Sequence, residues 1–125
     1  MEEIKYLTAE EYKDLISSIH AGNRNSIMDL ACLLTLNQRY DEALDILEIG
    51  AKQNDIPCLI RIGQIYWSKK KNYRMALKYY RMARDLMAPD NHVENMIIHN
   101  LKVLLLEENK NKLRKSLKRY KSKRT

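Results

Sequence analysis

The segment Tyr40-Asp41-Glu42-Ala43-Leu44 returns 33 residues later as Tyr73-Arg74-Met75-Ala76-Leu77. The alignment continues beyond these positions, because Leu47 falls on Tyr80 and Gly50 falls on Ala83. In both copies a small residue follows a large apolar one at helical spacing. A period in the low thirties with two helices in each unit is typical of helical solenoids.

The residues before the repeated segment also align, once one residue is inserted in the turn. The aligned pairs are Leu30 with Ile62, Ala31 with Gly63 and Leu34 with Tyr66. The distance between two packed helices depends on the side chains at their contact, so close hairpins need small residues there. We therefore expect Ala31 or Gly63 to face Ala43 or Ala76, and Gly50 and Ala83 to let the next hairpin stack.

Helical spacing of apolar residues extends over the whole chain, and no long segment alternates with period two. A Thr8–Glu11 capping box begins the first expected helix and Gly22 ends it. The expected helices span residues 8–21, 27–36, 40–52, about 55–70, 73–87 and 90–107. The 3 Gly and 2 Pro are too few for the turns of an all-β fold. The sequence predicts an all-α fold of six or seven helices.

These residues resemble tetratricopeptide repeats, or the related Sel-type helical repeats. The second copy matches through Ile62-Gly63, Tyr66, Tyr73, Ala76, Tyr80, Ala83 and Pro89, and the first more loosely through Leu30-Ala31, Leu34, Tyr40, Ala43, Leu47 and Gly50. The Gly-rich turn of the longer Sel-type unit is missing, which favours the tetratricopeptide assignment. The resemblance covers residues 24–89 and implies a short right-handed solenoid of helical hairpins.

The expected organisation is a helical-repeat domain over residues 1–109 and a basic tail or helix over residues 110–125. Within the domain, the resemblance implies a cap helix 8–21, one repeat over 24–56 and another over 57–89. Residues 90–107 would be either the first helix of a third unit or a second cap. Solenoids usually need three units for stability, so the outer helices would cover the open faces. Pairing of two copies through those open ends is a further expectation.

In tetratricopeptide-like proteins the first helices line a concave groove that binds peptides. By position, the resemblance implies a partner-binding groove made by Met28, Asp29, Cys32, Thr35, Arg61, Gln64 and Trp67, to which Ile60, Asn95 and His99 could add. Trp67 is the only Trp and follows the core-assigned Tyr66, so it would point about 100° away. Trp and Arg are over-represented in binding hot spots. The alternative for Trp67 is packing under the turn 69–71.

Positive charge is concentrated at the C-terminal end. Residues 110–125 hold 9 Lys and Arg and no acid, which leaves 14 basic and 16 acidic residues in 1–109. The basic candidates are Lys112, Arg114, Lys115, Lys118, Arg119 and Lys121. Three interpretations stay open: a solvated end that folds on binding, a helix docked through Leu113 and Leu117 on residues 97–105, or a basic helix for nucleic acid or an anionic surface.

Opposite charges lie at equivalent positions of the two copies. Asp41, Asp45 and Glu48 correspond to Arg74, Lys78 and Arg81. Either these side chains face each other across stacked hairpins, or the basic set recruits an acidic partner. Exposed pairs of this kind contribute only about 0–1 kcal/mol each, so they would set the register of stacking more than its stability.

Motifs of enzymes and metal sites are missing from the sequence. Cys32 and Cys58 have no CxxC spacing, and the 3 His do not form a zinc-ligand pattern. There is no P-loop, dinucleotide fingerprint or Gly-rich nucleophile elbow. The acidic start Met1-Glu2-Glu3 is unlike a leader, and no apolar run reaches the length of a membrane span. We expect a cytoplasmic, non-enzymatic chain without metal or cofactor, its two Cys unpaired.

The function predicted from these observations is that of a protein-interaction module, an adaptor or scaffold. It would bind a peptide or a partner helix on its concave face. The alternative is binding of nucleic acid or an anionic surface through residues 110–125.

Overall fold

The structure is a computed structural model, and it describes residues 5–87 and 92–124. Within these residues the chain forms six helices and no β-strand, which confirms the all-α prediction. The helices are α1 (Ala9–His20), α2 (Arg24–Leu36), α3 (Tyr40–Ala51), α4 (Ile56–Ser68), α5 (Tyr73–Leu86) and α6 (His92–Arg124). In this part of the chain, no helix combines the length and the apolar character that crossing a bilayer requires.

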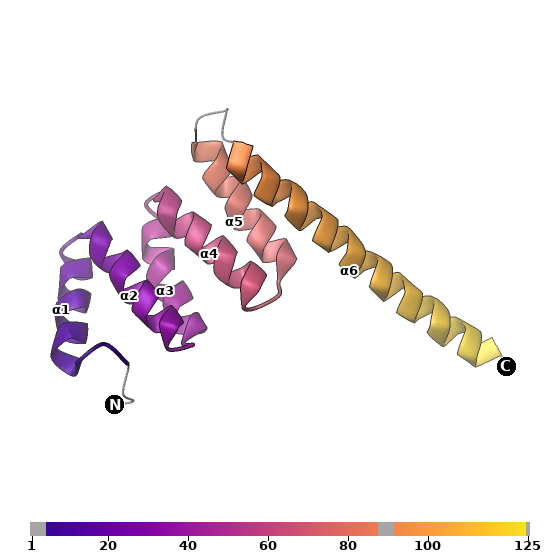
Figure 1. The fold of residues 1–125 in the computed structure, drawn as a ribbon, viewed down its shortest axis with the longest axis horizontal. Helices are drawn as coiled ribbons and strands as arrows, with labels where there is room; N and C mark the ends of the chain where they lie inside the picture. Colours follow the sequence, from indigo (N-terminus) through magenta and orange to yellow (C-terminus); the bar gives the residue numbers. More distant parts are fainter. Residues whose placement is uncertain (1–4, 88–91, 125) are drawn as a thin grey trace.

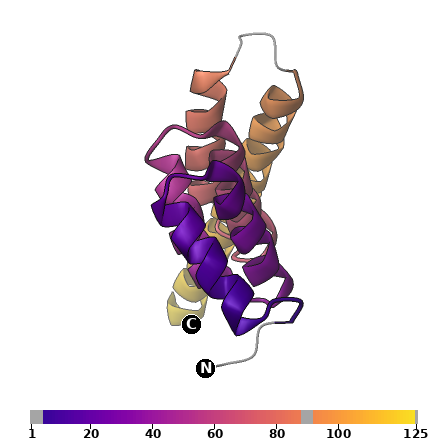
Figure 2. The same ribbon diagram turned by 90° about the vertical axis from the view of Figure 1, so that its left-hand side faces the viewer.

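The helices pack in the order of the chain, each mainly against the next one (Figure 1). Helices α1 to α5 form a row, and the first half of α6 packs against α5. Seen from the α1 end, α5 and α6 run side by side at the far end of the row (Figure 2). The second half of α6 extends beyond the row into solvent (Figure 1).

Side-chain caps fix where the helices begin. The Thr8 hydroxyl accepts from the Glu11 amide at 3.1 Å and the Glu11 carboxylate accepts from the Thr8 amide at 3.4 Å, so the predicted capping box is present. Asp55 accepts from the Cys58 amide at 3.3 Å and caps α4 as predicted. Helix α2 begins at Arg24 rather than at 27, because Asn23 accepts from the Asn25 amide and caps it there.

The small residues of the two copies lie at close helix contacts. Ala31, Ala43 and Ala76 are completely buried. A Cβ added to Gly63 would lie 2.8 Å from the Tyr80 ring, so the nearest neighbour of Gly63 of α4 is Tyr80 of α5. The backbone of α4 therefore approaches α5 closely enough to rest on an aromatic ring.

Gly50 has a similar role between α3 and α4. A Cβ at this position would overlap the Cys58 sulfur, because α3 and α4 touch there. Gly50 therefore lets the second hairpin, α4–α5, stack on the first, α2–α3, as the sequence predicted.

Helix α6 differs from the expectation of an end near Glu107, because it continues to Arg124. No Gly or Pro lies between residues 90 and 125 to stop it. The interpretation that this end docks back is wrong: Leu113 and Leu117 are 62% and 51% exposed, and residues 109–123 are all exposed. The C-terminal basic residues therefore lie on a projecting helix.

Candidate functional site

Four of the seven predicted groove residues surround one hollow, which we call the α2–α4 hollow. Its volume is about 290 Å³. The lining residues are Thr35 from α2, Arg61, Gln64, Ile65, Trp67 and Ser68 from α4, and Lys69 just after α4. The structure therefore brings together Thr35, Arg61, Gln64 and Trp67, although they are up to 32 residues apart.

Hydrogen bonds to the helices orient several side chains of the α2–α4 hollow. The Thr35 hydroxyl donates to the Ala31 carbonyl at 2.7 Å, and the Ser68 hydroxyl donates to the Gln64 carbonyl at 2.7 Å. The Arg61 guanidinium donates to the Cys32 sulfur at 3.5 Å, a soft contact that leaves its other N–H groups for a ligand. Lys69 is the second cation, and among the described residues no carboxylate lines this hollow.

Trp67 lies between the α2–α4 hollow and a buried cluster of α5 and α6. It lines the α2–α4 hollow, and Lys69 of the following turn lines the same hollow. It also packs against the buried cluster of Ala76, Leu77, Tyr80, Ile98 and Leu101. The ring is half-buried, so part of it belongs to the core between α5 and α6. Truncation of Trp67 would therefore remove packing from this core.

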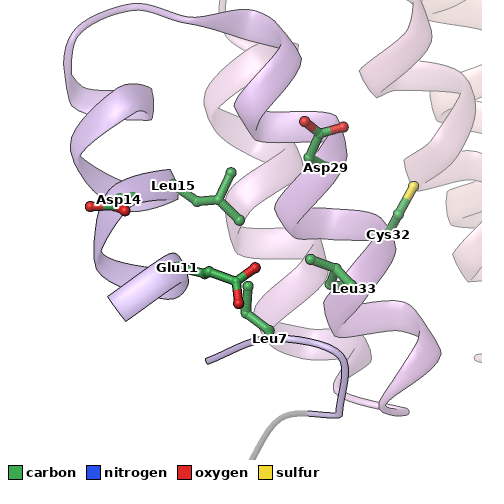
Figure 3. Close-up of a pocket in the computed structure, with 7 residues that line it drawn as sticks. All are labelled: Leu7, Glu11, Asp14, Leu15, Asp29, Cys32 and Leu33. Carbon is green, nitrogen blue, oxygen red and sulfur yellow. The ribbon is translucent and has the colours of Figure 1, made fainter. Parts of the chain in front are cut away.

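A second hollow, the α1–α2 hollow, has a volume of about 500 Å³ (Figure 3). It is lined by Leu7, Glu11, Asp14, Leu15, Asp29, Cys32 and Leu33. Leu15 and Glu11 reach from α1 towards α2, whereas Cys32 projects from the opposite side of α2 (Figure 3). The predicted Asp29 and Cys32 line this hollow and not the α2–α4 hollow, although the Cys32 sulfur stays in contact with Arg61.

Sequence reasoning missed five residues of the α1–α2 hollow: Leu7, Glu11, Asp14, Leu15 and Leu33. Glu11 was explained fully by its capping box, and Leu15 by the apolar stripe of its helix. The available signal was the acidic character of α1 beside that stripe, since Asp14 follows Glu11 by three residues and lies on the same side of the helix.

Met28 does not belong to the site, contrary to the prediction. It is half-buried, packs against the main core, and its sulfur lies 4.0 Å from the Cys58 sulfur. It is not among the residues that line either hollow. One helical turn separates Met28 from Cys32, and both sulfur atoms contact α4, Met28 at Cys58 and Cys32 at Arg61.

The two hollows carry opposite charge. The acidic residues Glu11, Asp14 and Asp29 are among those that line the α1–α2 hollow, and no Lys or Arg of the described residues lines it. Arg61 and Lys69 line the α2–α4 hollow. The bond from Arg61 to Cys32 connects the two, because Cys32 lines the acidic hollow and Arg61 lines the basic one. The face is therefore acidic on the α1 side and basic on the α4 side.

Two buried groups have raised pKa values, and both are structural. Burial, together with the hydrogen bond and negative charge of Asp55, raises the pKa of the Cys58 thiol to about 12. Burial and the 3.1 Å bond to Glu48 raise the pKa of the Tyr79 hydroxyl to about 12. Thiolates rather than thiols are nucleophilic, so Cys58 is inert at neutral pH. Within the described residues, no three His, Cys, Asp or Glu side chains are placed to hold a metal ion.

The predicted pairing of opposite charges between α3 and α5 takes a different form. Asp41 forms an ion pair with Lys70 of the α4–α5 turn, not with Arg74. Glu48 accepts a hydrogen bond from Tyr79 of α5, and the Lys78 ammonium lies 5.5 Å from the centre of that ring. The ion pairs found in residues 5–87 and 92–124 do not join the two predicted stripes directly.

The basic candidates of the tail are all exposed on α6: Lys112, Arg114, Lys115, Lys118, Arg119 and Lys121. Lys112 forms an ion pair with Glu108 at 3.1 Å, and Arg114 donates to Asn111 at 3.3 Å.

Comparison of the chain with known protein families, with curated proteins and with solved structures finds no match.

Proposed function

We propose that this chain is a non-catalytic protein-interaction module that binds a peptide or partner helix along α2 and α4. The observation that carries the proposal is the convergence of Thr35, Arg61, Gln64 and Trp67 on one hollow. It combines an aromatic surface, a fixed guanidinium and an exposed amide. Small numbers of polar groups placed in an otherwise apolar hollow are typical of sites that orient a ligand.

The equivalence of the two hairpins supports a tetratricopeptide-like arrangement. Helices α2 and α4 begin 32 residues apart, and α3 and α5 begin 33 residues apart. Equivalent positions are buried alike: Leu30 with Ile62, Ala43 with Ala76, and Leu47 with Tyr80 are each at most 1% exposed. In such an arrangement α2 and α4 are the first helices of their units, and they supply the lining of the α2–α4 hollow.

The charges of the face define the ligand. A peptide that crosses it would place an acidic side chain or a carboxylate near Arg61 and Lys69, where an Arg fork binds carboxylates well. At the other end it would place a basic or apolar side chain in the α1–α2 hollow, among Leu15, Leu33 and three carboxylates. A peptide bound in the reverse direction would place like charges against each other at both ends, so the charges would favour one orientation.

The experiment is selection of peptides from a random displayed library on the full chain, followed by measurement of their dissociation constants. We expect Arg61→Glu to weaken the selected peptides at least tenfold, because it reverses the charge at the centre of the face. The matched control is Arg81→Glu, an exposed charge reversal on α5. Equal binding by both variants, with both folded by circular dichroism, would refute the proposal.

Binding of nucleic acid or an anionic surface is the second candidate function. Its support is the exposure of the basic side chains of residues 110–123 on the projecting helix. Neutralising several phosphates makes affinity fall steeply with salt, so retention on heparin across a salt series tests it. Retention that does not depend on residues 110–125 would contradict it.

A further inference from the structure

Helix α6 exposes six large apolar side chains. They are Met96, Val103, Leu106, Leu113, Leu117 and Tyr120, each between 45% and 65% exposed. Together with His99 and Lys110 they occupy positions 96, 99, 103, 106, 110, 113, 117 and 120. The steps alternate between 3 and 4 residues, which is the apolar spacing of a coiled coil. We call this line of eight residues the α6 seam.

The α6 seam is not the surface that packs on α5. The packed surface of α6 is centred on Ile98 and Leu101, which are 3% and 0% exposed. At about 100° per residue, Leu106 and Lys110 lie 500° and 900° after Leu101, on the opposite side of the helix. The first half of α6 thus has two apolar sides, of which α5 covers one.

The seam is long enough to hold a partner. It extends from Met96 to Tyr120, about 36 Å at 1.5 Å per residue. This is more than three heptads, the length at which a seam indicates a coiled coil rather than a chance pattern. Exposed apolar side chains scattered singly need no explanation, but a continuous line of them indicates an interaction surface.

The charges beside the seam identify the partner. The positions that flank it include Lys102, Arg114, Lys121 and Lys123, with Glu107 as an acidic exception. Charges at these positions determine which helix pairs with which. Two parallel copies of this chain would bring together two segments of 9 basic residues without an acid, and would place Lys110 against Lys110. An acidic partner helix would avoid both the repulsion between two basic segments and the pairing of Lys110 with Lys110.

We propose that the α6 seam binds an acidic amphipathic helix of a partner protein as a two-stranded coiled coil. Leu106, Leu113 and Leu117 would supply the apolar contact, and Lys110 would select a partner with an acidic side chain at that level. The surface is separate from the α2–α4 hollow, so the proposal stands independently of the function proposed there. Phosphate binding requires the basic side chains alone and leaves the apolar line unexplained.

The test uses the full chain and a synthetic helix of about four heptads with Leu at the two seam positions and Glu at the flanking ones. We expect binding in solution, at least tenfold weaker when the flanking Glu residues of the peptide are replaced by Lys. The double variant Leu113→Asn, Leu117→Asn should lose at least tenfold in affinity for the Glu peptide. The matched control, Leu113→Met with Leu117→Met, keeps the seam apolar and should bind as the parent chain does.

Three outcomes would overturn the proposal. One is no binding of the Glu peptide at high micromolar concentration. Another is equal binding by the Asn and Met variants, as expected if charge alone attracts the peptide or a single-stranded DNA. The last is a parent chain that sediments as a dimer together with an Asn variant that sediments as a monomer, because the occupant of the seam would then be a second copy.

Discussion

The two halves of α6 belong to one continuous helix but have different surroundings. Leu101 in the first half is completely buried against α5, whereas Leu113, about three turns later, is 62% exposed. The first half is stabilised by the packing of its apolar side on α5. The second half is stabilised by its own sequence, which contains the ion pairs Glu107–Lys110 and Glu108–Lys112 and no Gly or Pro.

This difference shows that, within α6, the formation of helix is not the same as packing into the fold. Isolated helices of about 15 residues are marginal in water, so the second half gains much of its order by continuing a helix already nucleated by packing. Loss of the packed half should unfold the molecule. Loss of the projecting half should remove a binding surface and leave the body of helices α1 to α5 as it is.

The largest expected effect compares the same substitution in the two halves. Leu101→Ala removes a fully buried side chain and should lower the free energy of unfolding by about 2–5 kcal/mol. Leu113→Ala should change it by less than about 0.5 kcal/mol, because the side chain is exposed. Urea unfolding of both variants, followed by Trp67 fluorescence, measures the difference. Equal losses would mean that the second half packs on the body in solution.

The repeated residues made it possible to predict the burial of small side chains in the two hairpins, α2–α3 and α4–α5. Small residues such as Ala43 and Ala76 are completely buried, and a helical pattern with small residues at a fixed period leaves few ways to pack. The contact of Gly63 with Tyr80 was not predicted, because a sequence pattern shows which positions are small but not which side chain lies nearest to them. The structure places Tyr80 there.

The length of α6 and the division of the groove were harder to predict. The helix was expected to end near Glu107 because the apolar pattern changes there, although nothing in the sequence stops a helix. The α1–α2 hollow depends on how far α1 lies from α2, which local spacing does not determine. Asp29 and Cys32 therefore line a different hollow from Arg61 and Trp67.

A second comparison inserts bulk instead of removing it. Ala76→Leu places a large side chain at a completely buried position of α5, and we expect a loss of about 1–3 kcal/mol from overpacking. Ser116→Leu adds a similar bulk on the exposed half of α6 and should stay within about 0.5 kcal/mol. Chemical unfolding measures both. An unchanged midpoint for Ala76→Leu would show that this contact has room to spare.

Alkaline pH should weaken the body through Cys58. Its pKa rises from 9.0 to about 12 on folding, so above pH 9 the unfolded chain loses a proton that the folded chain keeps. Stability should therefore fall as pH rises from 9 towards 12, by at most about 1.4 kcal/mol per pH unit for one proton. Tyr79 adds to the fall above pH 10. Cys58→Ala should flatten the pH dependence of the urea midpoint between pH 9 and 10. An unchanged slope in that variant would mean that groups other than Cys58 cause the loss of stability.

The smallest effect on stability, and the sharpest separation of the two halves, is expected from Ser116→Pro. Proline in a helix interior removes a hydrogen bond and clashes with the preceding turn, so the helix should be interrupted in the projecting half. Residues 109–123 are exposed, and for that reason the free energy of unfolding, measured in urea by Trp67 fluorescence, should change by less than about 0.5 kcal/mol. The far-ultraviolet circular dichroism should decrease relative to Ser116→Ala.

The same proline variant should lose the acidic helix from the α6 seam, because a coiled coil needs a continuous helix on both sides. A proline variant that unfolds the body would show that the projecting half contributes to the fold, and one that still binds the acidic helix would show that the seam beyond residue 116 is not used.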